Sequence, residues 1–403
     1  MTHLSNGLTL IVLPRPGLPF ASMVLGFHAE PAPADAPGAR IAVMFARRQR
    51  GGLSALERGV LESISRDSDS YREHMSLFSD EIEQALSLVE DQTDTMYLKW
   101  PSSAFERWGA RDAILEGTEE QRAWRSFEEA LWGSHPYGSW PRAESALRVT
   151  ESQAEAWLDR VYRPRNGVLV VVGNVDAAEV ARRAEKKLDG WKDGKSAVPA
   201  PPVPAAASRP AASVARVEVT AANRSTTTIH FGCLLPPVVA TRDTVVNRLF
   251  SELVDRDMFH RLRIEQGESY SPSVKAIFLR GGTAWMHGEL DVAPGAASRA
   301  LDVVHAWLDV AAPVPYDEIA VERTRWRLAR RSNLRYDTNE KMARLLFDTW
   351  NMGWEPASLD GYPQALARVG AADLNRALAA CRASAVVSLV GLAPALSPSN
   401  GPR

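Results

Sequence analysis

The fold of this chain is decided by residues 135–176, which have the sequence HPYGSWPRAESALRVTESQAEAWLDRVYRPRNGVLVVVGNVD. Apolar residues recur at helical spacing over 150–161 and predict an amphipathic helix. The run VLVVV at 168–172 is short, apolar and β-branched, and it predicts a buried strand that ends at Gly173. Asp176 then stands where the N-cap of a further helix is expected. The stretch therefore encodes a helix, a buried strand, a glycine turn and the start of a second helix.

The same order of elements returns near the end of the chain. Residues 369–394, VGAADLNRALAACRASAVVSLVGLAP, again contain an amphipathic helix, an apolar strand and a glycine turn. Gly391 follows its strand at the place that Gly173 takes in the first half. Self-similarity of this kind predicts a duplicated α/β domain.

A single linker separates the two similar halves. Residues 193–214, DGKSAVPAPPVPAAASRPAASV, are rich in proline and alanine and lack apolar periodicity, so they are expected to be extended and semi-rigid. The predicted organisation is an N-terminal domain at 1–192, the linker at 193–214 and a C-terminal domain at 215–403.

In each half, strands are expected early and helices later. The expected strands are 7–13, 21–28, 70–78, 168–172, 214–220, 226–235, 272–279, 284–292 and 385–390. The expected helices are 38–48, 79–96, 103–116, 120–132, 150–161, 176–191, 241–263, 296–311, 316–335, 338–351 and 371–381. Helices that separate antiparallel strands predict an α+β fold, with a mainly antiparallel sheet covered by helices in each domain, and not a doubly wound parallel sheet.

Composition limits the possible partners. The 403 residues are 45% hydrophobic and 24% charged, which is ordinary for a soluble protein. A net charge of −2 and a pI near 6.5 give no reason to expect nucleic acid as a partner. No stretch approaches the roughly eighteen apolar residues of a membrane span. The N-terminus lacks the features of a signal peptide, so a cytoplasmic location is expected. Abundant alanine and arginine suggest a bacterial source.

The two cysteines, Cys233 and Cys381, lie in the apolar contexts HFGCLLPP and ALAACRASAVV. Neither a disulfide scaffold nor a cysteine-based metal site is indicated by so few cysteines. The expectation is two buried thiols in a reducing compartment.

One stretch comes close to a zinc motif. Residues 70–78, SYREHMSLF, place Glu73 beside His74, and Ser70 stands where a histidine would complete His-x-x-Glu-His. The apolar positions favour a strand, not the helix that this motif requires. None of the eight histidines is four residues from another, so no helix can present a pair of imidazoles. Glu73 and His74 are predicted to be a surface pair and not a zinc site.

Four features together resemble the pitrilysin/insulinase family of zinc peptidases, in the half-length, two-subunit branch that includes the mitochondrial processing peptidase. They are LSNGLTLIVLP at 4–14, the block at 135–176, FHRLRIEQGESYSPSV at 259–274, and the two-domain length with its central linker. The resemblance covers essentially the whole chain. It implies two homologous α+β domains that form half of a clam-shaped peptidase.

The position of the family's zinc motif is occupied by other residues. Aligning PGARIAVMFARRQRGG, residues 37–52, on its Pro-Gly turn puts Val43, Ala46 and Arg47 where the resemblance implies His, Glu and His. None of these three side chains can bind zinc or activate a zinc-bound water. Glu116 stands near the place of the third ligand, but a lone carboxylate does not make a zinc site.

The family's second signature is intact. The resemblance implies that an arginine and a tyrosine seven residues apart reach toward the substrate at the partner's zinc, and Arg263 and Tyr270 have this spacing. A guanidinium and a phenol can both donate to a peptide carbonyl whose oxygen becomes negatively charged. The structural alternative is that Arg263 pairs with Glu265 or Glu268 and that Tyr270 only begins a strand.

The resemblance therefore implies a non-catalytic subunit of a heterodimeric zinc metalloendopeptidase. A sister chain with an intact His-x-x-Glu-His would hold Zn²⁺, no metal is expected in this chain, and the substrate would be an unfolded peptide or small precursor. The alternative is a scaffold or peptide-binding protein with no role in proteolysis.

Two other features have simpler interpretations. His135, in HPYG, is expected to shape a turn. The six arginines between 323 and 335 are expected to lie on a solvated helix face, with a role in selecting acidic peptides as the alternative.

Overall fold

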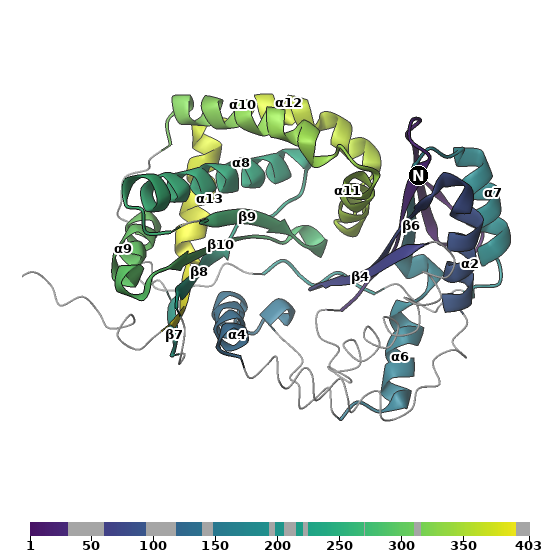
Figure 1. Cartoon of the computed structure of the whole chain (residues 1–403), viewed down its shortest axis with the longest axis horizontal. Coiled ribbons are helices and arrows are strands. Elements are labelled where there is room, and N and C mark those ends of the chain that lie inside the picture. The colour runs from purple at the N-terminus through teal and green to yellow at the C-terminus, as the bar shows by residue number, and fades with distance from the viewer. Residues whose placement is uncertain are drawn as a thin grey trace, which may run out of the picture. The chain divides into compact units, whose positions relative to one another are not determined.

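The chain has an α+β fold, as the sequence predicts, with two separate sheets covered by helices (Figure 1). The structure is a computed structural model, and it describes residues 1–30, 60–93, 118–138, 148–192, 198–204, 215–220, 225–269, 271–309 and 316–391. The expected helices at 38–48 and 103–116 lie outside this part of the chain.

The chain forms two compact units that are not contiguous in sequence. Unit 1 comprises Met1–Leu115, Trp140–Pro201 and Ser332–Pro356. Unit 2 comprises Glu116–Ser139, Pro202–Arg331 and Ala357–Arg403. The units therefore do not follow the domain boundary expected at the linker. Glu116–Ser139, from the first half of the chain, belongs to unit 2, and Ser332–Pro356, from the second half, belongs to unit 1.

The two sheets have the same topology. In spatial order, the sheet of unit 1 contains β1 (Thr2–His3), β2 (Thr9–Pro14), β6 (Gly167–Gly173), β3 (Phe20–His28), β5 (Ser70–Phe78) and β4 (Leu61–Asp67). The sheet of unit 2 contains β7 (Ala215–Thr220), β11 (Val386–Gly391), β8 (Thr227–Leu234), β10 (Ala284–Val292) and β9 (Ser273–Phe278). From β2 and β7 onward each sheet begins with one parallel pair and continues with antiparallel pairs. This match supports the predicted duplication, and Gly173 and Gly391 end equivalent strands.

The helices agree with the expected ranges to within a few residues over most of the described chain. They are α2 (Ile82–Thr93), α4 (Glu119–Trp132), α6 (Glu151–Val161), α7 (Ala177–Leu188), α8 (Thr241–Met258), α9 (Ala297–Leu308), α10 (Glu318–Arg335), α11 (Asn339–Asn351), α12 (Tyr362–Ala367) and α13 (Ala371–Ala383). Strands β1 and β4 and helix α12 were not predicted. None of the helices in the described ranges is both long enough and apolar enough to cross a membrane.

Capping explains where the helices of the opening stretch begin. The Thr150 hydroxyl accepts a hydrogen bond from the Gln153 backbone N–H at 3.2 Å, and the Gln153 side chain accepts one from the Thr150 N–H at 3.0 Å. This reciprocal pair is a capping box, which satisfies donors that the first turn leaves open. Asp176 caps α7 as predicted, accepting from the Glu179 N–H at 2.8 Å.

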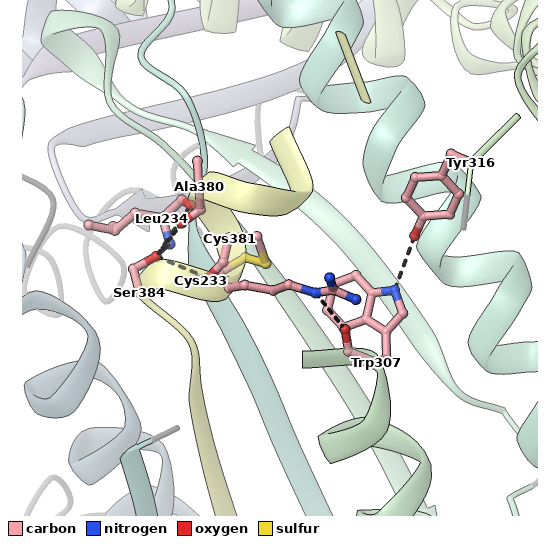
Figure 2. Close-up of a disulfide and its surroundings, with 8 residues drawn as sticks. Cys233, Leu234, Trp307, Tyr316, Ala380, Cys381 and Ser384 are labelled. Carbon is pink, nitrogen blue, oxygen red and sulfur yellow. Dashed lines mark hydrogen bonds between the residues drawn. A yellow bond between two sulfur atoms is a disulfide. The ribbon is translucent and has the colours of Figure 1, made fainter. Parts of the chain in front are cut away.

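A buried polar residue joins helix to strand in each unit. In unit 1 the Asn166 amide donates to the carbonyls of His28, at 2.6 Å, and Val161, at 2.7 Å. In unit 2 the Ser384 hydroxyl accepts from the Leu234 N–H at 2.9 Å and donates to the Ala380 carbonyl at 3.2 Å (Figure 2). Asn166 comes just before β6 and Ser384 just before β11, which are equivalent strands, so the duplication extends to individual hydrogen bonds.

The exchanged helices cover the second face of each sheet. Helix α11, from the C-terminal half of the chain, packs on β3 and β6, while α4, from the N-terminal half, packs on β7, β8 and β11. The contact depends on a glycine in each sheet. A Cβ on Gly26 would lie 2.0 Å from the Phe347 ring, and a Cβ on Gly232 would lie 2.9 Å from the Phe127 ring. The equivalent glycines leave room for an aromatic ring from the other half of the chain.

Cys233 and Cys381 form a disulfide, so the prediction of two free thiols is wrong. Cys233 lies on β8 and Cys381 on α13, and both are fully buried beside Ser384 (Figure 2). The apolar contexts indicated burial correctly. They carry no signal that residues 148 apart in sequence come together, because that proximity depends on helix α13 packing on the unit 2 sheet.

We expect Gly26→Val to destabilise the protein, because no side chain at this position can avoid the Phe347 ring. Overpacking of this kind costs about 1–3 kcal/mol of the free energy of unfolding. Urea unfolding followed by circular dichroism measures the loss. Gly190→Ala is the control, since a Cβ on Gly190 meets nothing within 4 Å. Equal stability of the Gly26 variant and the control would contradict the proposed role of the glycine.

We expect the double variant Cys233→Ala/Cys381→Ala to lose about 2–5 kcal/mol, because the disulfide restricts the unfolded chain over a long loop. Urea unfolding of the wild type with and without reductant makes the comparison, and the reduced wild type should approach the variant. Titration of thiols in denaturant without reductant is the control. Two reactive thiols in the wild-type protein would show that the pair is not bonded.

Candidate functional site

Arg263 lies in an exposed turn that continues helix α8. The α-helix ends at Met258, and residues Phe259–Glu265 form a π-helix, a rare geometry that is frequent at functional sites. Leu262 is fully buried and anchors this turn, while Arg263 is exposed. The sequence predicted a helix through residue 263 but gave no signal for the change in hydrogen bonding.

The end of the turn is held by backbone hydrogen bonds. The N–H groups of Glu268 and Ser269 both donate to the Leu262 carbonyl, at 2.8 and 3.2 Å. Gly267 has a φ of +67°, a conformation that glycine adopts without strain. The Ser269 hydroxyl then donates to the Asp291 carbonyl on β10 at 2.9 Å. The residue before Tyr270 is thus fixed to the sheet of unit 2.

The two carboxylates considered as partners for Arg263 have other basic side chains beside them. Glu265 lies 3.1 Å from the Nδ1 atom of His260. Glu268 lies 2.6 Å from the Arg299 guanidinium. Both carboxylates therefore lie beside a basic side chain other than Arg263, and the Arg263 side chain is exposed.

The remaining residues of the predicted site lie outside the described residues. They are Tyr270 and the positions assigned to the altered zinc motif and its third ligand, Val43, Ala46, Arg47 and Glu116. Of the predicted site, the structure therefore places Arg263 and the anchored chain that leads into Tyr270.

The predicted surface pair of Glu73 and His74 is wrong. Successive residues of a strand point to opposite faces, and both faces of the unit 1 sheet are covered. Glu73 is fully buried and accepts a hydrogen bond from the Tyr71 hydroxyl at 2.5 Å, and His74 lies 2.7 Å from the Ser22 hydroxyl on the other face. The two side chains therefore do not act together.

His135 has the structural role that the sequence predicts. Its Nδ1 atom accepts a hydrogen bond from the Tyr137 N–H at 3.2 Å, and its Nε2 atom donates to the Pro202 carbonyl at 2.8 Å. In α10, Arg331 is exposed and pairs with Glu252 at 2.6 Å, while Arg330 stacks on Trp326. These contacts fit the solvated helix face expected for the arginine run.

Two buried histidines and a glutamate come together on the unit 2 sheet. In the antiparallel register His230 of β8 faces Glu289 of β10, and His287 lies two residues before Glu289 on the same face. The His230 Nδ1 atom is 3.2 Å from the His287 Nε2 atom and 3.7 Å from the Glu289 carboxylate. Trp124 of α4 lies edge-on to both imidazoles, with ring centroids 5.5 and 4.7 Å away.

The surroundings keep His287 neutral. Burial is the main cause that lowers the pKa of His287 from 6.5 to about 3, and the neighbouring His230 and Lys275 add to the effect. Burial raises the pKa of the Glu289 carboxyl, and Asp291 raises it further. The site therefore combines a neutral His287 imidazole with a half-exposed carboxyl group.

This cluster was not predicted, because its histidines lie on two strands and have no helical spacing in the sequence. The available signal is the His-x-Glu pattern at 287–289, which puts both side chains on one face of the expected strand 284–292. His230 comes from another strand 57 residues away, and only the pairing of β8 with β10 brings it near.

Comparison with known proteins gives one match by sequence and many by structure. The sequence model described as "Peptidase M16 inactive domain" matches residues 148–327. No curated protein matches the sequence.

Solved structures share the fold over nearly the whole chain. A peptidase M16 inactive domain from Pseudomonas fluorescens is 17% identical with a TM-score of 0.79, and the match covers 98% of this chain and 99% of that one. A protease from Helicobacter pylori is 13% identical with a TM-score of 0.80, covering 97% and 98%. A chain of complex III2 from Candida albicans is 12% identical with a TM-score of 0.76, covering 99% and 97%. At these identities the likeness concerns the fold alone.

We expect His287 to make the protein less stable in acid. The unfolded state takes up a proton below pH 6.5, but the folded state does not until about pH 3. The free energy of unfolding should therefore fall with pH across this window, by up to about 1.4 kcal/mol per pH unit from this group. Above pH 6.5 the contribution is pH-independent.

Urea unfolding of the wild type and of His287→Gln at several pH values, with chelator present, measures this contribution. The variant should lose less stability than the wild type on going from about pH 7.5 to about pH 5, because one group no longer takes up a proton on unfolding. Parallel curves for the two proteins would contradict the assignment.

Proposed function

We propose that the chain is a non-catalytic protein of the M16 peptidase type, the pitrilysin/insulinase family, and that it serves as the non-catalytic subunit of a heterodimeric zinc metalloendopeptidase. The observation that carries the proposal is that this sequence has one of the two family signatures and not the other. The zinc-motif positions hold Val43, Ala46 and Arg47, whereas the arginine and tyrosine of the second signature, Arg263 and Tyr270, are both retained.

The geometry around Arg263 supports a role in substrate binding. The side chain is exposed on a π-helical turn whose far end is fixed to β10 through Ser269. Fixing the backbone on both sides reduces the conformational entropy that would be lost on binding. Arg263 and Tyr270 would donate hydrogen bonds to the carbonyl oxygen of the scissile peptide and stabilise its negative charge in the tetrahedral intermediate.

The partner would supply the chemistry that this chain lacks. It would carry His-x-x-Glu-His, hold Zn²⁺ with the two imidazoles, and use the glutamate as general base. The substrate would be an unfolded peptide or small precursor that pairs with a sheet edge. Among the described strands, β4 and β9 are the last strands of the two sheets. A location in the bacterial cytoplasm remains a prediction, and the disulfide does not favour it, because such bonds persist mainly in oxidising compartments.

The alternative is a scaffold or peptide-binding protein with no part in proteolysis. Its support is the similarity in fold to a chain of complex III2 from Candida albicans. A scaffold has no need for an exposed arginine and a tyrosine at the signature spacing, so the retained pair favours the peptidase subunit.

Affinity purification of the tagged chain from its host, followed by identification of the bound proteins, distinguishes the two functions. The proposal expects a partner of similar length in equal amount that carries His-x-x-Glu-His and zinc. Recovery of the chain alone, or with proteins that lack this motif, would favour the scaffold function.

In the reconstituted complex, we expect Arg263→Ala and Tyr270→Phe each to lower kcat by about 10²–10³, because each removes one donor to the developing oxyanion. Gel filtration should show unchanged assembly with the partner. Arg261→Ala is a matched control from the same turn, since Arg261 pairs with Asp257 at 3.0 Å. Full activity of both the Arg263 and Tyr270 variants would refute the roles assigned to them.

A further inference from the structure

The three side chains of the unit 2 cluster converge from two adjacent strands. His230, His287 and Glu289 each offer one ligand atom, and these atoms all lie within 4.8 Å of one another. They are the only group of three or more potential ligands of this kind within the described ranges. The strands hold the cluster rigidly, because β8 and β10 remain paired along their full lengths.

The spacing of the ligand atoms fits a tetrahedral metal ion. Bonds of about 2.0–2.1 Å from zinc to nitrogen or oxygen place neighbouring ligand atoms roughly 3.3–3.4 Å apart. The two imidazole nitrogens are 3.2 Å apart, and His230 is 3.7 Å from the Glu289 carboxylate. A small rotation of the half-exposed glutamate side chain would be enough to complete the geometry.

We propose that His230, His287 and Glu289 form a binding site for a divalent transition-metal ion of the zinc type. Two imidazoles and one carboxylate are ligands that Zn²⁺ and Co²⁺ accept readily. Three protein ligands leave one coordination position for water or another ligand. The Glu289 side chain is 46% exposed, so an ion can approach from its side of the cluster.

The contact between the two histidines also favours an ion. The His230 Nδ1 atom and the His287 Nε2 atom face each other at hydrogen-bond distance, and a bound ion would take the place of the proton between them.

The fold itself does not require these residues. The duplication provides the comparison, because Gly26 and Gly232 are equivalent and pair with Arg72 and His287 respectively. From this register, the positions of His230, His287 and Glu289 correspond in unit 1 to Val24, Arg72 and His74. The same sheet accepts an aliphatic and a cationic residue there, so packing alone does not explain two facing histidines and a carboxylate in unit 2.

The site is distinct from the family's zinc motif. That motif would lie at residues 43–47, whereas the cluster lies on β8 and β10 beneath Trp124 of α4. A bound ion would join the two strands close to Asp291, the residue that accepts the hydrogen bond from Ser269. This inference does not depend on the proposed peptidase partner, and the purified chain alone can test it.

The test is a titration of the chelator-treated, full-length protein with Co²⁺, followed by visible absorption, and then displacement by Zn²⁺. The wild type should show one saturable site with the intense bands of low-coordinate cobalt, which disappear as Zn²⁺ is added. His287→Gln and Glu289→Gln should each weaken binding by more than the roughly 10–100-fold that loss of an outer-shell partner causes. His74→Gln is the matched control, because His74 occupies the position equivalent to Glu289 and has no second histidine facing it in the register.

Glu289→Gln keeps the test valid if the histidine variants fold poorly, because it changes a half-exposed side chain. Without metal, its melting temperature should equal that of the wild type. Absence of a saturable cobalt spectrum in the wild type would overturn the proposal and leave a buried histidine pair. A Glu289→Gln protein that melts normally and binds Co²⁺ as tightly as the wild type would also overturn it.

Discussion

The packing of an exchanged helix on a glycine of the sheet is the contact on which each unit depends. Phe347 of α11 lies over Gly26, and Phe127 of α4 lies close to Gly232. A sheet that is apolar on both faces must bury both, and among the described helices the one on the second face of each sheet comes from the other half of the chain. Each unit therefore includes a helix from the other half of the chain, although the sequence repeats itself.

The duplicated frame carries different side chains at equivalent positions. Asn166 and Ser384 perform the same task, since each connects a helix end to the neighbouring strand. The position of Cys233, which forms the disulfide, is taken in unit 1 by Phe27, whose ring contacts Tyr162 at a centroid distance of 4.2 Å. Backbone pairing and a few buried polar groups maintain both sheets, so equivalent positions on the two sheets can carry different side chains.

The candidate functional residues lie at positions where the fold tolerates different side chains. The proposed function needs no zinc ligand in this chain, and a metal site of this kind contributes to chemistry and not to the sheet. Arg263 is presented by a turn that is fixed through Leu262 and Ser269. The cluster of His230, His287 and Glu289 lies elsewhere in unit 2. The pairing of β8 with β10 brings these groups together, and no helical motif is involved.

The sequence by itself determined the fold class, most of the elements and the duplication, and it gave the spacing of Arg263 and Tyr270 on which the predicted site rests. These features depend on local periodicity, on caps such as Asp176, or on spacing within one segment. The tertiary structure alone decided the exchange of α4 and α11, the disulfide, the burial of Glu73 and the meeting of His230 with His287. Each of these involves either residues far apart in the chain or a sheet face covered by a distant helix, and the strand pairing and helix packing that bring them together leave no local pattern in the sequence.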